Sequence, residues 1–108
     1  MAAPQNRELF IYADYASQPS RAVIGFCQLN KIKYTLVETR VGKREHLKPE
    51  FIAINPAMIV PAIVEVDKTT GEKWNLFESH AIMRYLASTH NVPDHWYPKD
   101  VLKRSLVD

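Results

Sequence analysis

The chain has 108 residues, which is enough for one domain around a single hydrophobic core. Hydrophobic residues make up 46% of it and charged residues 24%, as is typical of a globular protein. Its formal net charge of +2 is too small, and its lysines and arginines too scattered, for a nucleic-acid-binding surface. The single cysteine, Cys27, excludes an intrachain disulfide and a Cys-x-x-Cys redox pair. We expect no membrane span and a cytoplasmic location, because no apolar run reaches about 18 residues and no secretory signal is visible.

The first half of the chain alternates strand and helix patterns. Residues 8–13 are aromatic and β-branched enough to predict a buried first strand. Turn residues follow at 17–20, and apolar residues at helical spacing then predict a helix over 21–29. Residues 34–38 predict a second strand, so this half reads strand, helix, strand.

The second half predicts a hairpin between two helices. A short helix over 49–54 is stopped by Asn55-Pro56. A strand over 59–66 contains Pro61 near its start, and a loop over 67–73 leads into a returning strand at 74–77. Glu78 and Ser79 begin the last helix of this unit.

This order of elements predicts an α/β, thioredoxin-like βαβαββα domain over residues 1–90. Its four-stranded sheet is mixed, because a strand-helix-strand unit needs parallel strands and a hairpin needs antiparallel ones. Residues 91–108 are predicted to be a linker and the first turns of an all-helical C-terminal domain. A helix of about two turns is marginal alone, so we expect the chain to be the front part of a longer protein.

Three features of the backbone converge in such a fold: the N-termini of the first and last helices and the loop before Pro61. Helix N-termini offer unbonded N–H groups and a positive dipole end to anions. A cis Val60–Pro61 bond would turn the backbone of Val60 outward to pair with an extended ligand. The pattern indicates a site for a small peptide with carboxylates and a nucleophile. Two roles for Ser17 stay open, a helix N-cap and a hydroxyl that donates to a ligand thiolate.

Four segments together resemble one known family. They are residues 17–22, residues 51–55 followed by 60–62, residues 77–82, and residues 94–98. In this order they resemble the N-terminal domain of theta-class glutathione transferases, and the resemblance extends from Leu9 to Asp108.

The resemblance implies a glutathione site. Ser17 matches the family's catalytic serine, whose hydroxyl donates to the glutathione sulfur. Val60 matches the position whose backbone pairs with the cysteinyl unit. Glu78 and Ser79 match the pair that holds the γ-glutamyl end.

Further positions are carried over at the glycyl end and across a dimer. His46 matches a histidine near the glycyl carboxylate. Ile59 belongs to the same binding set, but it stands where relatives often have lysine or a polar residue, so we expect weaker carboxylate binding. Asp108 matches an acidic residue that reaches the γ-glutamyl amine of the partner subunit. The loop over 67–73 is longer than usual, which fits either a surface insertion or a partner contact.

The resemblance implies a glutathione transferase that joins the glutathione thiolate to small electrophiles, forms a homodimer, and uses glutathione as co-substrate with no other cofactor. The alternative is a non-catalytic transferase-like interaction module in a larger assembly. We expect no metal site, because His80, His90 and His95 lack the spacing of zinc ligands. Cys27 is expected in the core.

Overall fold

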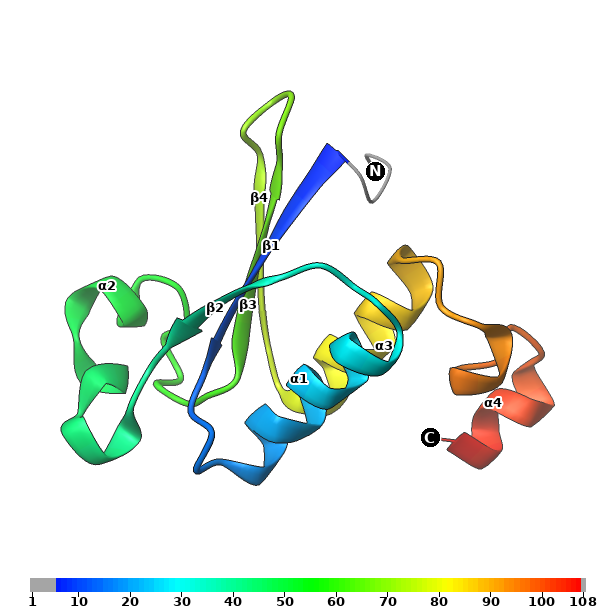
Figure 1. Ribbon diagram of the computed structural model, residues 1–108, viewed down its shortest axis with the longest axis horizontal. Helices are drawn as coiled ribbons and strands as arrows, with labels where there is room; N and C mark the ends of the chain where they lie inside the picture. Colours follow the sequence, from blue (N-terminus) through cyan, green and yellow to red (C-terminus); the bar gives the residue numbers. More distant parts are fainter. Residues whose placement is uncertain (1–5, 108) are drawn as a thin grey trace.

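The computed structural model describes residues 6–107, and all the predicted helices and strands are present (Figure 1). The strands are β1 (Arg7–Ala13), β2 (Thr35–Glu38), β3 (Ala62–Asp67) and β4 (Lys73–Phe77). The helices are α1 (Gln18–Leu29), α2 (Pro49–Ile52), α3 (Ser79–Thr89) and α4 (Val101–Val107).

Several boundaries differ from the sequence prediction. Helix α1 begins at Gln18 and not at 21, because Ser17 caps it and proline is well tolerated in the first turn. Strand β3 begins at Ala62 and not at 59, because Pro61 has no N–H to give to a neighbouring strand. The loop at 39–47, between β2 and α2, contains two short 3-10 turns, Val41–Lys43 and Glu45–Leu47.

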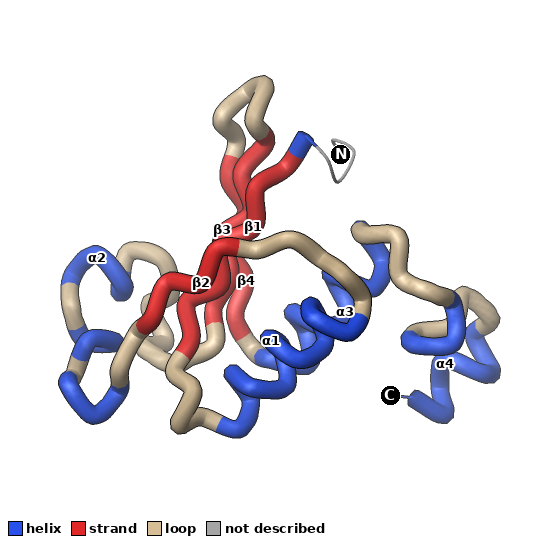
Figure 2. The backbone as a smooth tube through the Cα atoms, in the orientation of Figure 1, coloured by secondary structure: helices blue, strands red, loops and turns tan. Residues whose placement is uncertain are grey.

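The four strands form one mixed sheet in the order β2-β1-β3-β4. Strand β1 runs parallel to β2 and antiparallel to β3, and β3 is antiparallel to β4. Helices α1 and α3 pack side by side on one side of the sheet, and α2 lies on the other side (Figures 1 and 2). This is the thioredoxin-like arrangement that the order of elements predicts.

The core lies between the sheet and the pair α1 and α3. Every second residue of β1 is buried there, as expected for a strand with one covered face. The buried apolar residues of the core cluster come from the α1–β2 connection, two strands and two helices: Leu9, Ile11, Ala13, Val23, Ile24, Phe26, Cys27, Ile32, Ile63, Ile82 and Leu86.

A charged cluster lies at one end of this core. Glu65 on β3 is fully buried, and its carboxylate forms an ion pair with Arg7 at 3.0 Å. The Tyr85 hydroxyl donates to the same carboxylate, and His90 Nε2 lies 2.9 Å from its second oxygen. Arg7 also donates to the Thr89 carbonyl at 2.6 Å. The cluster therefore joins β1, β3 and the end of α3.

The cluster shifts the pKa values of two members. Burial by itself raises the pKa of Glu65, but hydrogen bonds from His90 and Tyr85 and the charge of Arg7 outweigh it, so this pKa lies below its ordinary value. Burial and the hydrogen bond to Glu65 raise the pKa of Tyr85 to about 12. Glu65 is therefore ionised and Tyr85 is a neutral donor at neutral pH.

Removing the charge of Glu65 is expected to destabilise the domain strongly. Glu65→Gln leaves the guanidinium of Arg7 buried without its counter-charge, which costs about 3–5 kcal/mol of unfolding free energy. Since the pKa of Glu65 is lowered on folding, its contribution is complete above the ordinary value of 4.5 and is lost as the pH falls through the lower, folded value. The difference between wild type and variant should therefore shrink in acid. Denaturant unfolding across this pH range measures it.

Glu72→Gln is the matched control, because Glu72 is exposed in the β3–β4 hairpin. We expect it to change the unfolding free energy by less than about 0.5 kcal/mol. Equal effects of the two substitutions would contradict the structural role of Glu65.

Candidate functional site

The strand register brings three segments to one end of the sheet. Strand β1 ends at Ala13, just before the turn that carries Ser17. Ala62, the first residue of β3, is paired with Tyr12 on one side and with Phe77 on the other. The turn after β1, the Val60–Pro61 bond before β3 and the Glu78–Ser79 pair after β4 are therefore neighbours, as the sequence predicts.

Ser17 is the N-cap of α1. Its backbone is extended, with φ −89° and ψ 123°, and its Oγ accepts a hydrogen bond from the Ser20 N–H at 3.3 Å. That bond uses a lone pair of the oxygen, so the hydroxyl hydrogen is still available. Among residues 6–107 it has no acceptor. The two roles considered for Ser17 are therefore compatible.

Asp14 holds this turn in place. Its carboxylate accepts from the Ala16 N–H at 2.9 Å and from the Val41 N–H at 3.0 Å, and its carbonyl accepts from the Ser17 N–H at 2.9 Å. The hydrogen bonds from the backbone of Ala16 and then Val41 hold the pKa of Asp14 below its ordinary value. The turn is thus tied to the loop at 39–47. Sequence reasoning did not single out Asp14, although an aspartate between a strand and a helix cap is typical of such turns.

Asn55 organises the loop before Pro61. It is fully buried, and its side chain donates to the Ile59 carbonyl at 2.9 Å and accepts from the Ala57 N–H at 2.9 Å. The Val60–Pro61 bond is cis, as predicted. The backbone of Val60 makes no hydrogen bond to another residue of the part of the chain described, so it can pair with a ligand. The sequence marked Asn55 only as a helix stop.

The N-terminus of α3 has no side-chain cap, in contrast to α1. Glu78 precedes it with φ 78°, in the region that favours glycine, and such a conformation costs about 1–3 kcal/mol. Ser79 is the first helical residue and is half-buried. An uncapped helix start beside a strained residue leaves N–H groups available to an anion.

The remaining predicted residues differ in how they are placed. His46 lies in the second 3-10 turn and is half-buried, and its Nδ1 is buried without a partner among residues 6–107. The Asp14–Val41 hydrogen bond ties the loop of His46 to the turn of Ser17. Ile59 is 44% exposed and brings an apolar side chain to the rim. Asp108 lies outside the described residues.

The family model of the glutathione S-transferase N-terminal domain matches residues 11–94. The chain belongs to the glutathione S-transferase family. Among curated relatives, 101 residues are 50% identical to glutathione S-transferase T1 of Arabidopsis thaliana, and 100 residues are 41% identical to mouse glutathione S-transferase theta-1. Each match covers 93% of this chain and 39% of the relative. The chain therefore spans well under half the length of these transferases.

Solved structures agree with the theta-class assignment. The apo form of human glutathione-S-transferase T1-1 aligns with a TM-score of 0.79 at 40% identity, over 93% of this chain and 39% of that one. Human glutathione transferase theta-2, solved in complex with glutathione and an unknown ligand, aligns with a TM-score of 0.79 at 37% identity. That match covers 90% of this chain and 37% of the human one.

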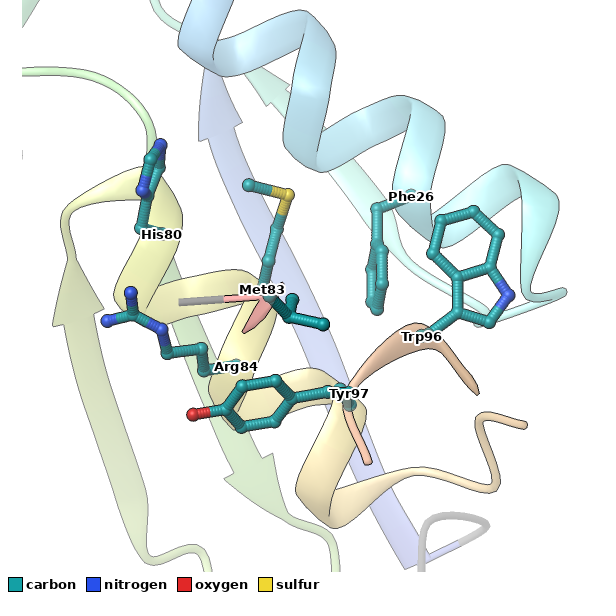
Figure 3. Close-up of a pocket in the computed structure, with 8 residues that line it drawn as sticks. Phe26, His80, Met83, Arg84, Trp96 and Tyr97 are labelled. Atoms are coloured by element: carbon teal, nitrogen blue, oxygen red, sulfur yellow. The ribbon is translucent and has the colours of Figure 1, made fainter. Parts of the chain in front are cut away.

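A first hollow of the domain lies away from Ser17. A cavity of about 260 Å³ lies between α1, α3, the segment around Trp96 and α4 (Figure 3). The rings of Phe26 and Trp96 meet edge to face at 5.5 Å, and the guanidinium of Arg104 lies 4.5 Å from the centre of the Tyr97 ring. Trp96 and Tyr97 are thus packing anchors.

The described part of the chain contains no reactive cysteine, no metal site and no membrane-spanning helix. Cys27 is fully buried, and burial together with the charge of Glu65 raises the pKa of its thiol to about 12, so it is a core residue as predicted. Residues 6–107 hold no group of three His, Cys, Asp or Glu side chains suited to a metal ion. The same residues include no helix long and apolar enough to cross a membrane.

Asn55→Ala is expected to destabilise the loop before Pro61. The Ile59 carbonyl and the Ala57 N–H both lose their partner, so the unfolding free energy should fall by about 1–3 kcal/mol. Denaturant unfolding measures the loss, and faster amide exchange at Ala57 would localise it. Asn75→Ala is the control, because the amide of exposed Asn75 makes only a 3.5 Å contact with the Ile54 carbonyl. A loss in the control as large as in Asn55→Ala would contradict the assignment.

Proposed function

We propose that this chain is the glutathione-binding domain of a glutathione transferase that conjugates the glutathione thiolate to small electrophiles, with Ser17 as the catalytic residue. The main support for the proposal is that three groups without a hydrogen-bond partner among residues 6–107 lie close together at one end of the sheet. They are the hydroxyl hydrogen of Ser17, the backbone of Val60 and the uncapped start of α3 at Ser79.

Each group suits one part of glutathione. The α3 N-terminus and the Ser79 hydroxyl suit the γ-glutamyl carboxylate, because N–H groups and a positive dipole end attract an anion. Glu78 beside it supplies a carboxylate for the γ-glutamyl amine. The backbone of Val60 suits the extended cysteinyl unit.

The glycyl end would lie toward the loop of His46. Its imidazole supplies a donor for the glycyl carboxylate, whereas the exposed side chain of Ile59 supplies none. We therefore propose that the glycyl carboxylate is held less firmly than the γ-glutamyl end.

Ser17 is sufficient to activate the thiol without a general base. A model cysteine thiol has a pKa of about 8.5, so only a few per cent is ionised at pH 7. A hydrogen bond to a charged group contributes about 1.5–3 kcal/mol, and a helix N-terminus about 0.3–1 kcal/mol. At 1.36 kcal/mol per pKa unit, the two lower the thiol pKa by about one to three units.

The proposal also covers the division of the chain into two domains. We propose that residues 1–90 form the glutathione-binding domain and that 91–108 begin a helical domain. The exposed apolar side chains of α4 support this division, with Val101 at 75%, Leu102 at 78% and Leu106 at 88%. A homodimer, a cytoplasmic location and the absence of a further cofactor stay predictions.

The second candidate is a non-catalytic interaction module. The β3–β4 hairpin favours it, because its loop projects beyond the rest of the sheet with charged and polar side chains that are exposed (Figure 1). The two proposals differ in whether glutathione bound at the site ionises near neutral pH.

Ser17→Ala separates a helix cap from a thiolate donor. Loss of the charge-assisted bond should raise the thiol pKa of bound glutathione by about one to two units, and loss of the cap should cost about 0.5–2 kcal/mol of stability. A pH titration of thiolate absorbance in the complete protein measures the first effect. Ser17→Thr, which keeps the hydroxyl, should retain most of the wild-type value. Superimposable titrations of wild type and Ser17→Ala would leave Ser17 as a cap alone.

Ser79→Ala should weaken glutathione binding about tenfold, because the ligand carboxylate loses a donor worth roughly 1.4 kcal/mol. Isothermal titration calorimetry measures the affinity. Ser88→Ala, at an exposed position of the same helix, should leave it unchanged. Absence of glutathione binding to the folded wild-type protein at millimolar concentration would favour the interaction module.

A further inference from the structure

A second hollow lies at the end of β1 opposite the Ser17 turn. This cavity of about 340 Å³ is formed by the first residue of β1, the α1–β2 connection, the start of the β3–β4 hairpin and the end of α3. Five of its lining side chains are basic or can become so: Arg7, Lys31, Lys33, Lys68 and His90. We call it the basic cavity.

The net positive charge of the basic cavity comes from its lysines, because Glu65 beneath the floor offsets Arg7. None of the described residues that line it is acidic, and Asn30 and Asn91 add amide groups. The nearest carboxylate of the charged cluster, Glu65, is fully buried and already bonded to Arg7 and His90. A concave wall that carries one sign of charge focuses its field and concentrates counter-ions.

The charges of Lys31 and Lys33 take part in no interaction that stabilises the fold among the described residues. Three carbonyls in the last turn of α1 accept backbone hydrogen bonds: Phe26 from the Asn30 N–H, Cys27 from the Ile32 N–H and Gln28 from the Lys31 N–H. Neither lysine has an ion-pair partner among residues 6–107. The charges of Lys31 and Lys33 are therefore available to a ligand.

The floor of the cavity is more rigid than its rim. The side chain of Arg7 is 1% exposed and that of His90 is 10% exposed, and Glu65 holds both in place. Lys31 and Lys33 lie exposed at the rim, within reach of a ligand. A fixed floor with an exposed cationic rim is suited to a compact anion with several oxygens.

We propose that the basic cavity binds a small phosphate-bearing anion of the size of pyrophosphate. Lysine is a common phosphate ligand, and the cavity has the volume of a small-molecule site. The proposed glutathione site lies at the other end of β1, so this binding is independent of the transferase proposal.

Titration with pyrophosphate at constant ionic strength, followed by amide chemical shifts of the full chain, tests the proposal. Saturable shifts are expected at residues 30–33, 68 and 90–91, and not at Ser17 or Ser79. Lys31→Gln/Lys33→Gln should weaken the affinity about twenty-fivefold, which is about fivefold or roughly 1 kcal/mol for each lysine.

Lys99→Gln/Lys103→Gln is the control, because it removes the same charge at exposed positions outside the cavity. It should leave the affinity within about twofold of wild type, since distant surface charges are screened. Equal losses in the two double variants, shifts that do not saturate, or shifts centred elsewhere would each overturn the proposal. The mapping on the wild-type chain does not depend on whether a variant folds.

Discussion

The antiparallel pairing of β1 with β3 is the constraint on which both ends of this molecule depend. Its register places Tyr12 beside Ala62 and Arg7 beside Asp67. The first pair brings the Ser17 turn next to the cis Val60–Pro61 bond, and the second brings Arg7 to the start of the hairpin. Because side chains alternate along a strand, a slip of one residue would turn the core face outward and separate both groups.

The same register explains how charge enters the core. Glu65 is paired with Leu9, two residues from Arg7 on the same face of β1, so the carboxylate and the guanidinium meet under the helices. Two buried charges are costly unless their remaining hydrogen-bonding capacity is used. Tyr85 of α3 and His90, the residue directly after α3, meet that need, and they thereby fix the end of α3 against the sheet.

The two helix starts at the candidate site are built differently. Helix α1 is capped by the side chain of Ser17, whereas α3 begins without a side-chain cap, after a residue at positive φ. A protein that needed only stability would cap both, since a cap contributes about 1 kcal/mol. The contrast is consistent with a site where one helix start presents a hydroxyl and the other presents unbonded N–H groups to an anion.

The sequence alone determined the order of the elements and indicated the candidate site residues. Alternation and helical spacing predicted every strand and helix, and proline position together with the family resemblance indicated Ser17, Val60, Pro61 and Ser79. These features depend on neighbours a few residues away, which a linear pattern records.

Only the tertiary structure revealed the residues that act across the chain. Glu65 binds Arg7 across 58 positions, and Asp14 joins Val41 across 27. Asn55 acts over shorter distances, but its burial is set by the packed fold. The partner of a carboxylate or an amide cannot be read from the sequence. Its contribution to stability depends on whether folding buries it and on which groups folding places beside it.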